Sequence, residues 1–197
     1  MASPFEQIPP SPPLAKGGGG GFCARGRRGD RAAGEAGTER LDPWEVAVRL
    51  LAGQALTTHE LQQRLARRGY ASDQISVVIA RLTASRYLDD VEYARSWARS
   101  RAHRRCVGPA RLAQELRIKG IAEEHIAGAL AEAFGERDVR EVAEAAALRK
   151  LRTFRDLEPE VARRRLAAHL TRQGFAIEIV LALCWKYIPH GGEFNDQ

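Results

Sequence analysis

The chain has 197 residues, of which 44% are hydrophobic and 28% are charged, a balance typical of a globular protein with one or two domains. Its net charge is only +6, and no apolar run approaches the ~20 residues that cross a bilayer, which argues against an integral membrane protein. The three cysteines lie far apart without metal-ligand spacing, and the N-terminal residues include no apolar segment of the secretory kind. These features predict a cytoplasmic protein.

Residues 1–41 are rich in Gly and Pro and include five consecutive glycines at 17–21. Such a segment buries too little apolar surface to offset the entropy lost on ordering. We therefore expect a disordered N-terminal tail over 1–41, and a short C-terminal tail over 189–197.

The segment after the N-terminal tail carries the start and stop signals of three helices. Asp42 is a typical N-cap residue and precedes a proline, which suits the first helical position. Thr57 and Glu60 have the spacing of a capping box, Gly69 ends the helix that follows, and Ser72 starts the third. No stretch of the chain sustains a two-residue alternation, so the sequence predicts an all-α fold.

A pattern of two leucines, a glycine and a following apolar residue then recurs at identical offsets. The three copies are Leu61-Leu65-Gly69-Tyr70, Leu112-Leu116-Gly120-Ile121 and Leu166-Leu170-Gly174-Phe175. Each glycine suits a left-handed C′ position, over which the next apolar residue can pack. With a further helix before each copy, the pattern predicts three tandem three-helix repeats at 42–86, 87–135 and 136–188. Repeat units of this kind stack side by side, so we expect an elongated array.

The first helix of the second repeat is unusually basic. Asp89 and Glu92 form a capping-box pattern, and the helix that they start runs over 90–104. At 100° per residue, Ala94, Trp97 and Ala98 share one side, while Arg95 and Arg99 lie on the opposite, exposed side. A basic face of this kind indicates an anionic partner, although a merely solvated face stays an alternative.

Arginine offers a planar fork that matches carboxylate and phosphate groups. The candidate residues for contact with such a partner are Arg95, Arg99, Arg101, Arg104, Arg105, Arg111, Arg117 and Lys119. Arg101 and Arg104 fall near the apolar side of their helix, which suggests that the end of this helix overhangs its own bundle. A second group, whose exposure the sequence does not decide, could extend the basic strip: Arg149, Lys150, Arg152, Arg155 and Arg163 to Arg165.

Catalytic and metal-binding patterns do not occur in the sequence. The five histidines form neither an HExxH motif nor a close pair with a cysteine, and the chain contains no GxSxG motif and no Walker loop. Asp89 and Asp90 are adjacent carboxylates at a helix start, where acids usually serve as caps. We therefore predict that the protein is not an enzyme, has no catalytic or metal-binding residues and needs no cofactor.

Several short motifs of the central region resemble those of the RecX family. They are Leu88-Asp89-Asp90 with Tyr93-Ala94, Gly108-Pro109, Glu115-Leu116 and Lys119-Gly120-Ile121, and the similarity extends over about 46–187. The resemblance implies a cytoplasmic, monomeric regulator built from tandem three-helix repeats. Such a protein binds RecA nucleoprotein filaments and inhibits RecA ATPase, recombinase and coprotease activities in DNA repair and the SOS response. Arg86 departs from the pattern, because many relatives have glycine there.

The residues leave a second reading open. Stacked three-helix units can contain helix-turn-helix geometry, so the chain could be an autonomous helical DNA-binding regulator. No helix carries the mixture of Asn, Gln and Arg that is typical of a recognition helix, which weakens this alternative. Both readings allow contact with single- or double-stranded DNA.

Overall fold

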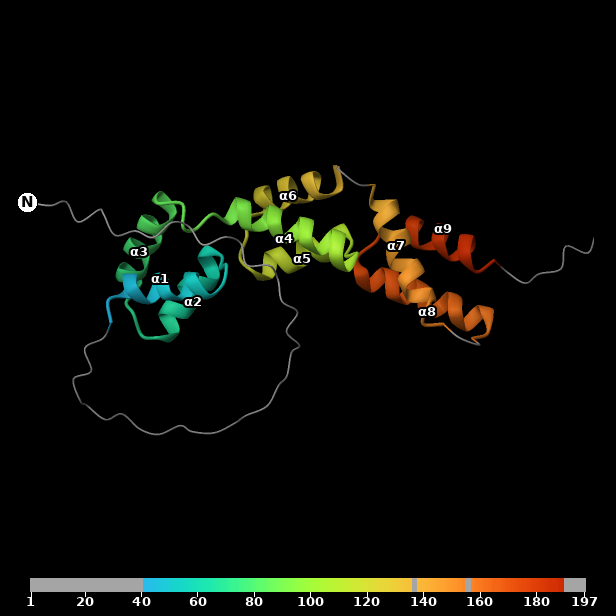
Figure 1. Cartoon of the computed structure of the whole chain (residues 1–197), viewed down its shortest axis with the longest axis horizontal. Helices are drawn as coiled ribbons and strands as arrows, with labels where there is room; N and C mark the ends of the chain where they lie inside the picture. Colours follow the sequence, from blue (N-terminus) through green and yellow to red (C-terminus); the bar gives the residue numbers. More distant parts are fainter. Residues whose placement is uncertain (1–40, 136–137, 155–156, 190–197) are drawn as a thin grey trace, which may run out of the picture. The chain divides into compact units, whose positions relative to one another are not determined.

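A computed structural model of the protein describes residues 41–135, 138–154 and 157–189. Within these residues all regular structure is helical (Figure 1). The helices are α1 (Pro43–Gly53), α2 (Thr58–Arg67), α3 (Ser72–Ala84), α4 (Asp90–Arg105), α5 (Pro109–Ile118), α6 (Glu123–Gly135), α7 (Val139–Leu151), α8 (Pro159–Gln173) and α9 (Ile177–Tyr187). The predicted all-α class is confirmed. Apart from Leu41 and Pro189, the predicted tails 1–41 and 189–197 lie outside the described residues.

The chain divides into two compact units, which we describe separately. Of the described residues, the first unit holds those up to Leu56 together with Leu61–Leu88. The second holds Thr57–Glu60 and the residues from Asp89 onward. The first turn of α2 therefore packs with the second unit. The repeat boundaries predicted at 86/87 and 135/136 stay predictions.

The first unit has a core of its own, formed by apolar residues of α1, α2 and α3. Leu61, Leu65 and Leu82 are completely buried in it. The N-cap predicted at Asp42 is confirmed, because its carboxylate accepts a hydrogen bond from the Trp44 backbone N–H at 3.1 Å.

The second unit contains two apolar clusters, one on α4, α5 and α6 and the other on α7, α8 and α9. Leu112 and Leu116 are fully buried in the first cluster, and Leu166 and Leu170 in the second. The leucines that define the predicted repeat are therefore core residues of three successive helix triplets. This result confirms the three-helix repeat.

The three repeat glycines adopt the left-handed backbone that their spacing predicts. The φ angles are 82° at Gly69, 77° at Gly120 and 87° at Gly174. The apolar residues after the second and third glycines, Ile121 and Phe175, are each 5% exposed. Both donate a backbone N–H to the last turn of the preceding helix, which is the expected way to end a helix at a glycine.

Arg86 is an arginine in the left-handed region, with φ 57°. A non-glycine residue in this region destabilises the folded state by about 1–2 kcal/mol. Glycine removes this strain, but it also makes the unfolded chain more flexible, which offsets part of the stabilisation. We expect Arg86→Gly to raise the free energy of unfolding by up to about 1 kcal/mol, measured by urea denaturation. Arg86→Ala is the control, since it removes the exposed side chain but keeps the strained backbone. Equal stability of the two variants would contradict the explanation by strain.

Within the second unit, the start of α5 abuts the end of α8. The Gly108 N–H donates to the Gln173 carbonyl at 2.8 Å, and the Ala110 N–H donates to the Gly174 carbonyl at 3.2 Å. A Cβ atom on Gly108 would lie 2.6 Å from the Gly174 oxygen. The Gly-Pro pair therefore serves two purposes: proline starts α5, and glycine lets two backbones approach closely.

The start of α2 meets the end of α5 at the equivalent repeat position. The Thr57 hydroxyl donates to the Lys119 carbonyl at 2.7 Å, and Thr57 is completely buried. A Cβ atom on Gly120 would lie 2.4 Å from the His59 Cβ. In both junctions, donors at the start of one repeat's second helix bind the last carbonyls of the next repeat's second helix. The partial charges of the two helix ends are complementary in this arrangement.

Candidate functional site

The basic helix α4 owes its position to small buried residues. Its N-cap is Asp89, whose carboxylate accepts from the Glu92 backbone N–H at 2.9 Å, as the capping pattern predicts. Ala94, Ala98 and Ala102 are almost fully buried, and α4 packs against both α5 and α6 through this face (Figure 1). The small side chains allow close helix packing, so the long arginines project from the remaining faces.

Arg95 and Arg99 lie on the exposed side of α4, as predicted, with about half of each side chain accessible. Both guanidinium groups pair with the same carboxylate, that of Glu132 on α6, and the Arg95 Nε lies 3.0 Å from it. One carboxylate cannot neutralise two guanidinium groups. The two guanidinium groups therefore carry one positive charge more than the carboxylate that binds them.

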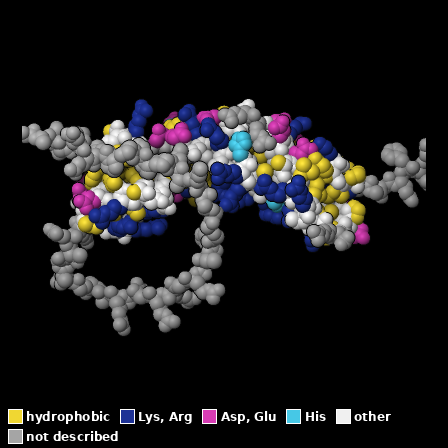
Figure 2. Space-filling view, viewed as in Figure 1, with side chains coloured by type: hydrophobic (Ala, Val, Ile, Leu, Met, Phe, Trp, Pro, Cys, Tyr) yellow, Lys and Arg dark blue, Asp and Glu magenta, His cyan; other side chains and the backbone are white. Residues whose placement is uncertain are grey.

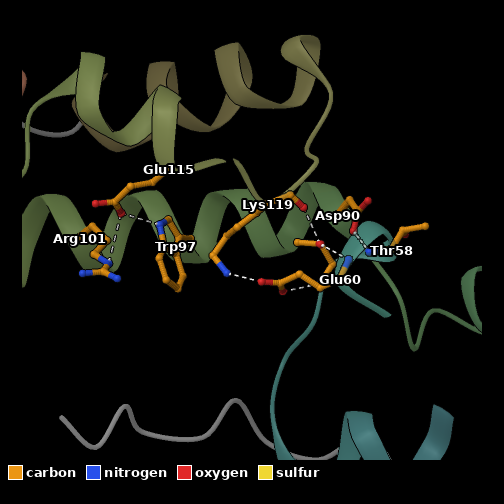
Figure 3. A network of polar contacts seen from close by, with 8 residues as sticks. Thr58, Glu60, Asp90, Trp97, Arg101, Glu115 and Lys119 are labelled. Atoms are coloured by element: carbon orange, nitrogen blue, oxygen red, sulfur yellow. Dashed lines mark hydrogen bonds and ion pairs between the residues drawn. The ribbon is translucent and has the colours of Figure 1, made fainter. Parts of the chain in front are cut away.

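A second carboxylate, that of Glu115 on α5, binds side chains on another side of α4 (Figure 3). It accepts from the Trp97 indole N–H at 3.2 Å and from the Arg111 Nε at 3.1 Å, and it lies 3.6 Å from the Arg101 Nε. The Arg101 guanidinium also lies over the Trp97 ring, 4.4 Å from its centre. Arg101 is thus held in place by a carboxylate and an indole ring, and does not overhang the bundle as the sequence suggested.

Lys119, at the end of α5, belongs to the junction with the first turn of α2. Its ammonium group lies 2.8 Å from the Glu60 carboxylate and 4.5 Å from the centre of the Trp97 ring. Burial by itself lowers the pKa of the Lys119 ammonium, but the hydrogen bonds to Glu60 and Tyr93 and the charges of these two groups together outweigh burial, so the pKa lies above its usual value. Lys119 is only 18% exposed. It therefore acts here as a structural cation rather than as an accessible contact residue.

The other candidates divide into paired and unpaired cations. Arg117 forms an ion pair with Glu123, with Nε 2.8 Å from the carboxylate. Arg104 and Arg105, at the end of α4, are exposed and form no ion pair with the residues that the structure describes. Arg101, Arg105 and Arg111 come together in one groove, where residues of α7 and α8 complete the lining.

Sequence reasoning missed the acids that position these arginines. The sequence identifies Glu115 only as part of a motif and predicts no ion pair for Glu115 or Glu132. The spacing of Arg111 and Glu115, four residues apart on one helix, is the sequence signal that could have indicated their pairing. The contact between Glu132 and α4 joins residues far apart in the chain, and has no local signal.

The described residues contain no cluster of three or more His, Cys, Asp or Glu side chains arranged to hold a metal ion. Over the same residues, no helix has the length and apolar character that crossing a membrane requires. Cys106 and Cys184 are both buried. Cys106 has φ 51° at the end of α4 and packs into the cluster of α7, α8 and α9, so it is a core residue.

Comparison with known proteins gives matches over both units. Residues 44–82 match the family model of the first three-helix domain of RecX, and residues 89–130 match that of the second. The "Regulatory protein RecX" of Mycolicibacterium vanbaalenii is 40% identical over 147 residues, which cover 70% of this chain and 79% of that protein. The protein of the same name from Mycobacteroides abscessus is 41% identical over 93 residues, and this match spans less than half of either chain (47% and 46%).

A solved structure supports the same fold. The chain is similar to a "Crystal structure of regulatory protein RecX" with a TM-score of 0.64 and 24% identity, over 72% of this chain and 69% of that one. The fold and the surface together define a helical-repeat protein with a basic central helix. The chain belongs to the RecX family.

Proposed function

We propose that this protein binds RecA nucleoprotein filaments and inhibits RecA ATPase, recombinase and coprotease activities. The observation that carries the proposal is membership of the RecX family, with matches to two successive three-helix domains of RecX. The partner, a RecA filament, is what the family resemblance implies. We also propose that the protein is a monomer in the cytoplasm, needs no cofactor and catalyses no reaction.

The basic surface of α4 suits such a partner. Arg95 and Arg99 are half exposed and share one carboxylate, so the pair retains one positive charge for binding acidic side chains or phosphates. An inhibitor of this kind acts by binding one state of the filament more tightly than the other. The three helix triplets provide successive surfaces for contact with neighbouring RecA subunits.

The direct test compares two ligands at the same salt concentration. Purified protein is titrated onto a pre-formed RecA filament on oligothymidylate, and onto oligothymidylate alone. We expect tighter binding to the filament, accompanied by inhibition of ATP hydrolysis. Equal affinity for both ligands, without inhibition, would instead support the autonomous DNA-binding regulator.

Neutralising the exposed side of α4 should weaken inhibition. We expect Arg95→Gln with Arg99→Gln to raise the protein concentration needed for half-inhibition of RecA ATP hydrolysis several-fold. The free energy of unfolding should change by only about 0.5–1 kcal/mol, because exposed ion pairs contribute little. Glutamine is chosen because charge reversal would place two further carboxylates beside that of Glu132.

Arg67→Gln with Arg68→Gln is the matched control, since it removes the same charge from exposed positions near the end of α2. We expect this variant to inhibit like the wild type. If both double variants lose inhibition equally, only the net charge matters, and the proposed role of α4 is wrong.

A further inference from the structure

The second unit contains a groove at the place where α4 and α5 meet α7 and α8. Its volume is about 520 Å³, and it is lined by Arg101, Arg105, Val107, Arg111, Ala146, Arg149, Lys150, Thr153, His169 and Gln173. Figure 2 shows dark-blue Lys and Arg side chains gathered over this part of the molecule. Five of the lining residues are Lys or Arg, and no described Asp or Glu is among them.

The positive charge of the groove is only partly neutralised. Glu115 pairs with Arg101 and Arg111, so one carboxylate serves two of the five cations. Arg105 and Arg149 are exposed and have no ion pair among the described residues. The Arg149 guanidinium donates a hydrogen bond to the Arg104 carbonyl at 3.2 Å, and this contact leaves its charge uncompensated.

The positive charges around the groove also act on the imidazole of His169. Burial lowers the pKa of its imidazole, and the neighbouring charges of Lys150, Arg172 and Arg111 lower it further. A neutral imidazole keeps one N–H donor and one acceptor nitrogen. The Thr153 hydroxyl and the Gln173 amide add neutral hydrogen-bonding groups to the lining, and Gln173 already accepts from Arg111 at 3.2 Å.

The guanidinium groups of Arg101 and Arg111 are held in place before any ligand arrives. Glu115 binds both of them, and the Trp97 ring supports Arg101 from one side. The close approach of Gly108 to Gly174 fixes the start of α5 against the end of α8, and so fixes the two walls of the groove. Preorganised donors lose less entropy on binding an anion than free side chains do.

The lining favours a chain of phosphates over an acidic protein segment. Protein partners gain most of their affinity from apolar anchors that enter pockets. The apolar lining residues here are Val107 and Ala146, which are only 2% and 4% exposed and cannot receive an anchor. Binding to a nucleic-acid backbone is mainly ionic, and arginine forks match phosphate groups.

We propose that this groove binds the phosphodiester backbone of a nucleic acid, with Arg105 and Arg149 as its accessible contacts and Arg101 and Arg111 as its preorganised ones. The site requires no RecA, so it stands independently of the proposed function. If the protein also binds a filament, the groove would add a contact to the DNA of that filament.

The test measures binding of fluorescein-labelled oligothymidylate to the full chain, without RecA, by anisotropy at several salt concentrations. Each phosphate contact on a single strand contributes about −0.7 to the slope of log K against log [salt]. Arg105→Ala with Arg149→Ala should therefore make the slope less steep by about 1.4, and weaken binding about 25-fold at 0.1 M salt. Arg105→Lys with Arg149→Lys should keep most of the slope, because the slope counts charges.

Arg67→Ala with Arg68→Ala is the control and should change the affinity less than twofold. A duplex of the same length, titrated in parallel, shows which form of nucleic acid the groove accepts. Unchanged binding of both forms by the Arg105/Arg149 variant, with its fold intact by circular dichroism, would overturn the proposal. So would a polyglutamate peptide that displaces the oligonucleotide at equal charge concentration, because the groove would then be a site for acidic protein segments. RecA inhibition is measured separately, so its failure leaves this result unaffected.

Discussion

Gly174→Ala is expected to destabilise the second unit by about 2–5 kcal/mol. Gly174 has φ 87°, where alanine costs about 1–2 kcal/mol. A Cβ atom there would also lie 2.4 Å from the Arg111 backbone nitrogen, and overpacking of this kind costs about 1–3 kcal/mol more. The backbone nitrogen cannot move aside without opening the junction between α5 and α8. Urea unfolding, followed by far-UV circular dichroism, measures the loss.

Two further alanine substitutions separate the causes. Gly108→Ala adds a Cβ atom at the same junction, 2.6 Å from the Gly174 oxygen. Gly108 has no positive φ, so the loss of stability in this variant measures the clash alone. A Cβ atom added at Gly128, within α6, would meet no atom within 4 Å beyond its own stretch of helix backbone, so Gly128→Ala should stabilise the protein by up to about 1 kcal/mol. A Gly174→Ala protein as stable as wild type would mean that the junction does not hold the two helices together.

Thr57→Val is expected to cost about 2–4 kcal/mol, although valine has almost the same shape. The Thr57 hydroxyl accepts from the Glu60 N–H at 3.1 Å and donates to the Lys119 carbonyl at 2.7 Å. Loss of an N-cap costs about 1 kcal/mol. A carbonyl left without its partner at a buried contact costs about 1–3 kcal/mol more.

Thr57→Ser is the control, because it keeps the hydroxyl and removes only a methyl group. We expect it to retain most of the stability that valine loses, in the same urea experiment. Hydrogen exchange at the Glu60 amide gives a local readout, and it should accelerate in the valine variant only. If serine and valine cost the same, the methyl packing matters and the hydrogen bonds do not.

Local sequence signals predicted much of this protein. The leucine and glycine pattern identified three helix triplets, because helix cores and left-handed C′ residues depend on neighbours a few positions away. The same reasoning placed the N-caps at Asp42 and Asp89 and the capping box between Thr57 and Glu60, all of which the structure contains. It also placed Arg95 and Arg99 on the exposed side of α4.

Only the tertiary structure decided how the arginines are used. Glu132 pairs with Arg95 and Arg99 across two helices, and no local pattern specifies which carboxylate a guanidinium will meet. The helical position of Arg101 suggested an overhanging end, whereas Glu115 and the Trp97 ring make its half-buried position favourable. Compensation of a buried charge depends on partners from other helices, which a helical wheel does not contain.

The groove is likewise a product of the fold. Arg105 and Arg149 are 44 positions apart, and they line one cavity because α4 and α7 pack in the same unit. Gly108 illustrates the same limit: the sequence shows it as part of a Gly-Pro motif, but its contact with Gly174 depends on a neighbouring repeat. Sequence alone determined the repeating helical unit of this RecX family member. Packing between helices determined which of its charges are buried, which are paired and which remain available to bind a partner.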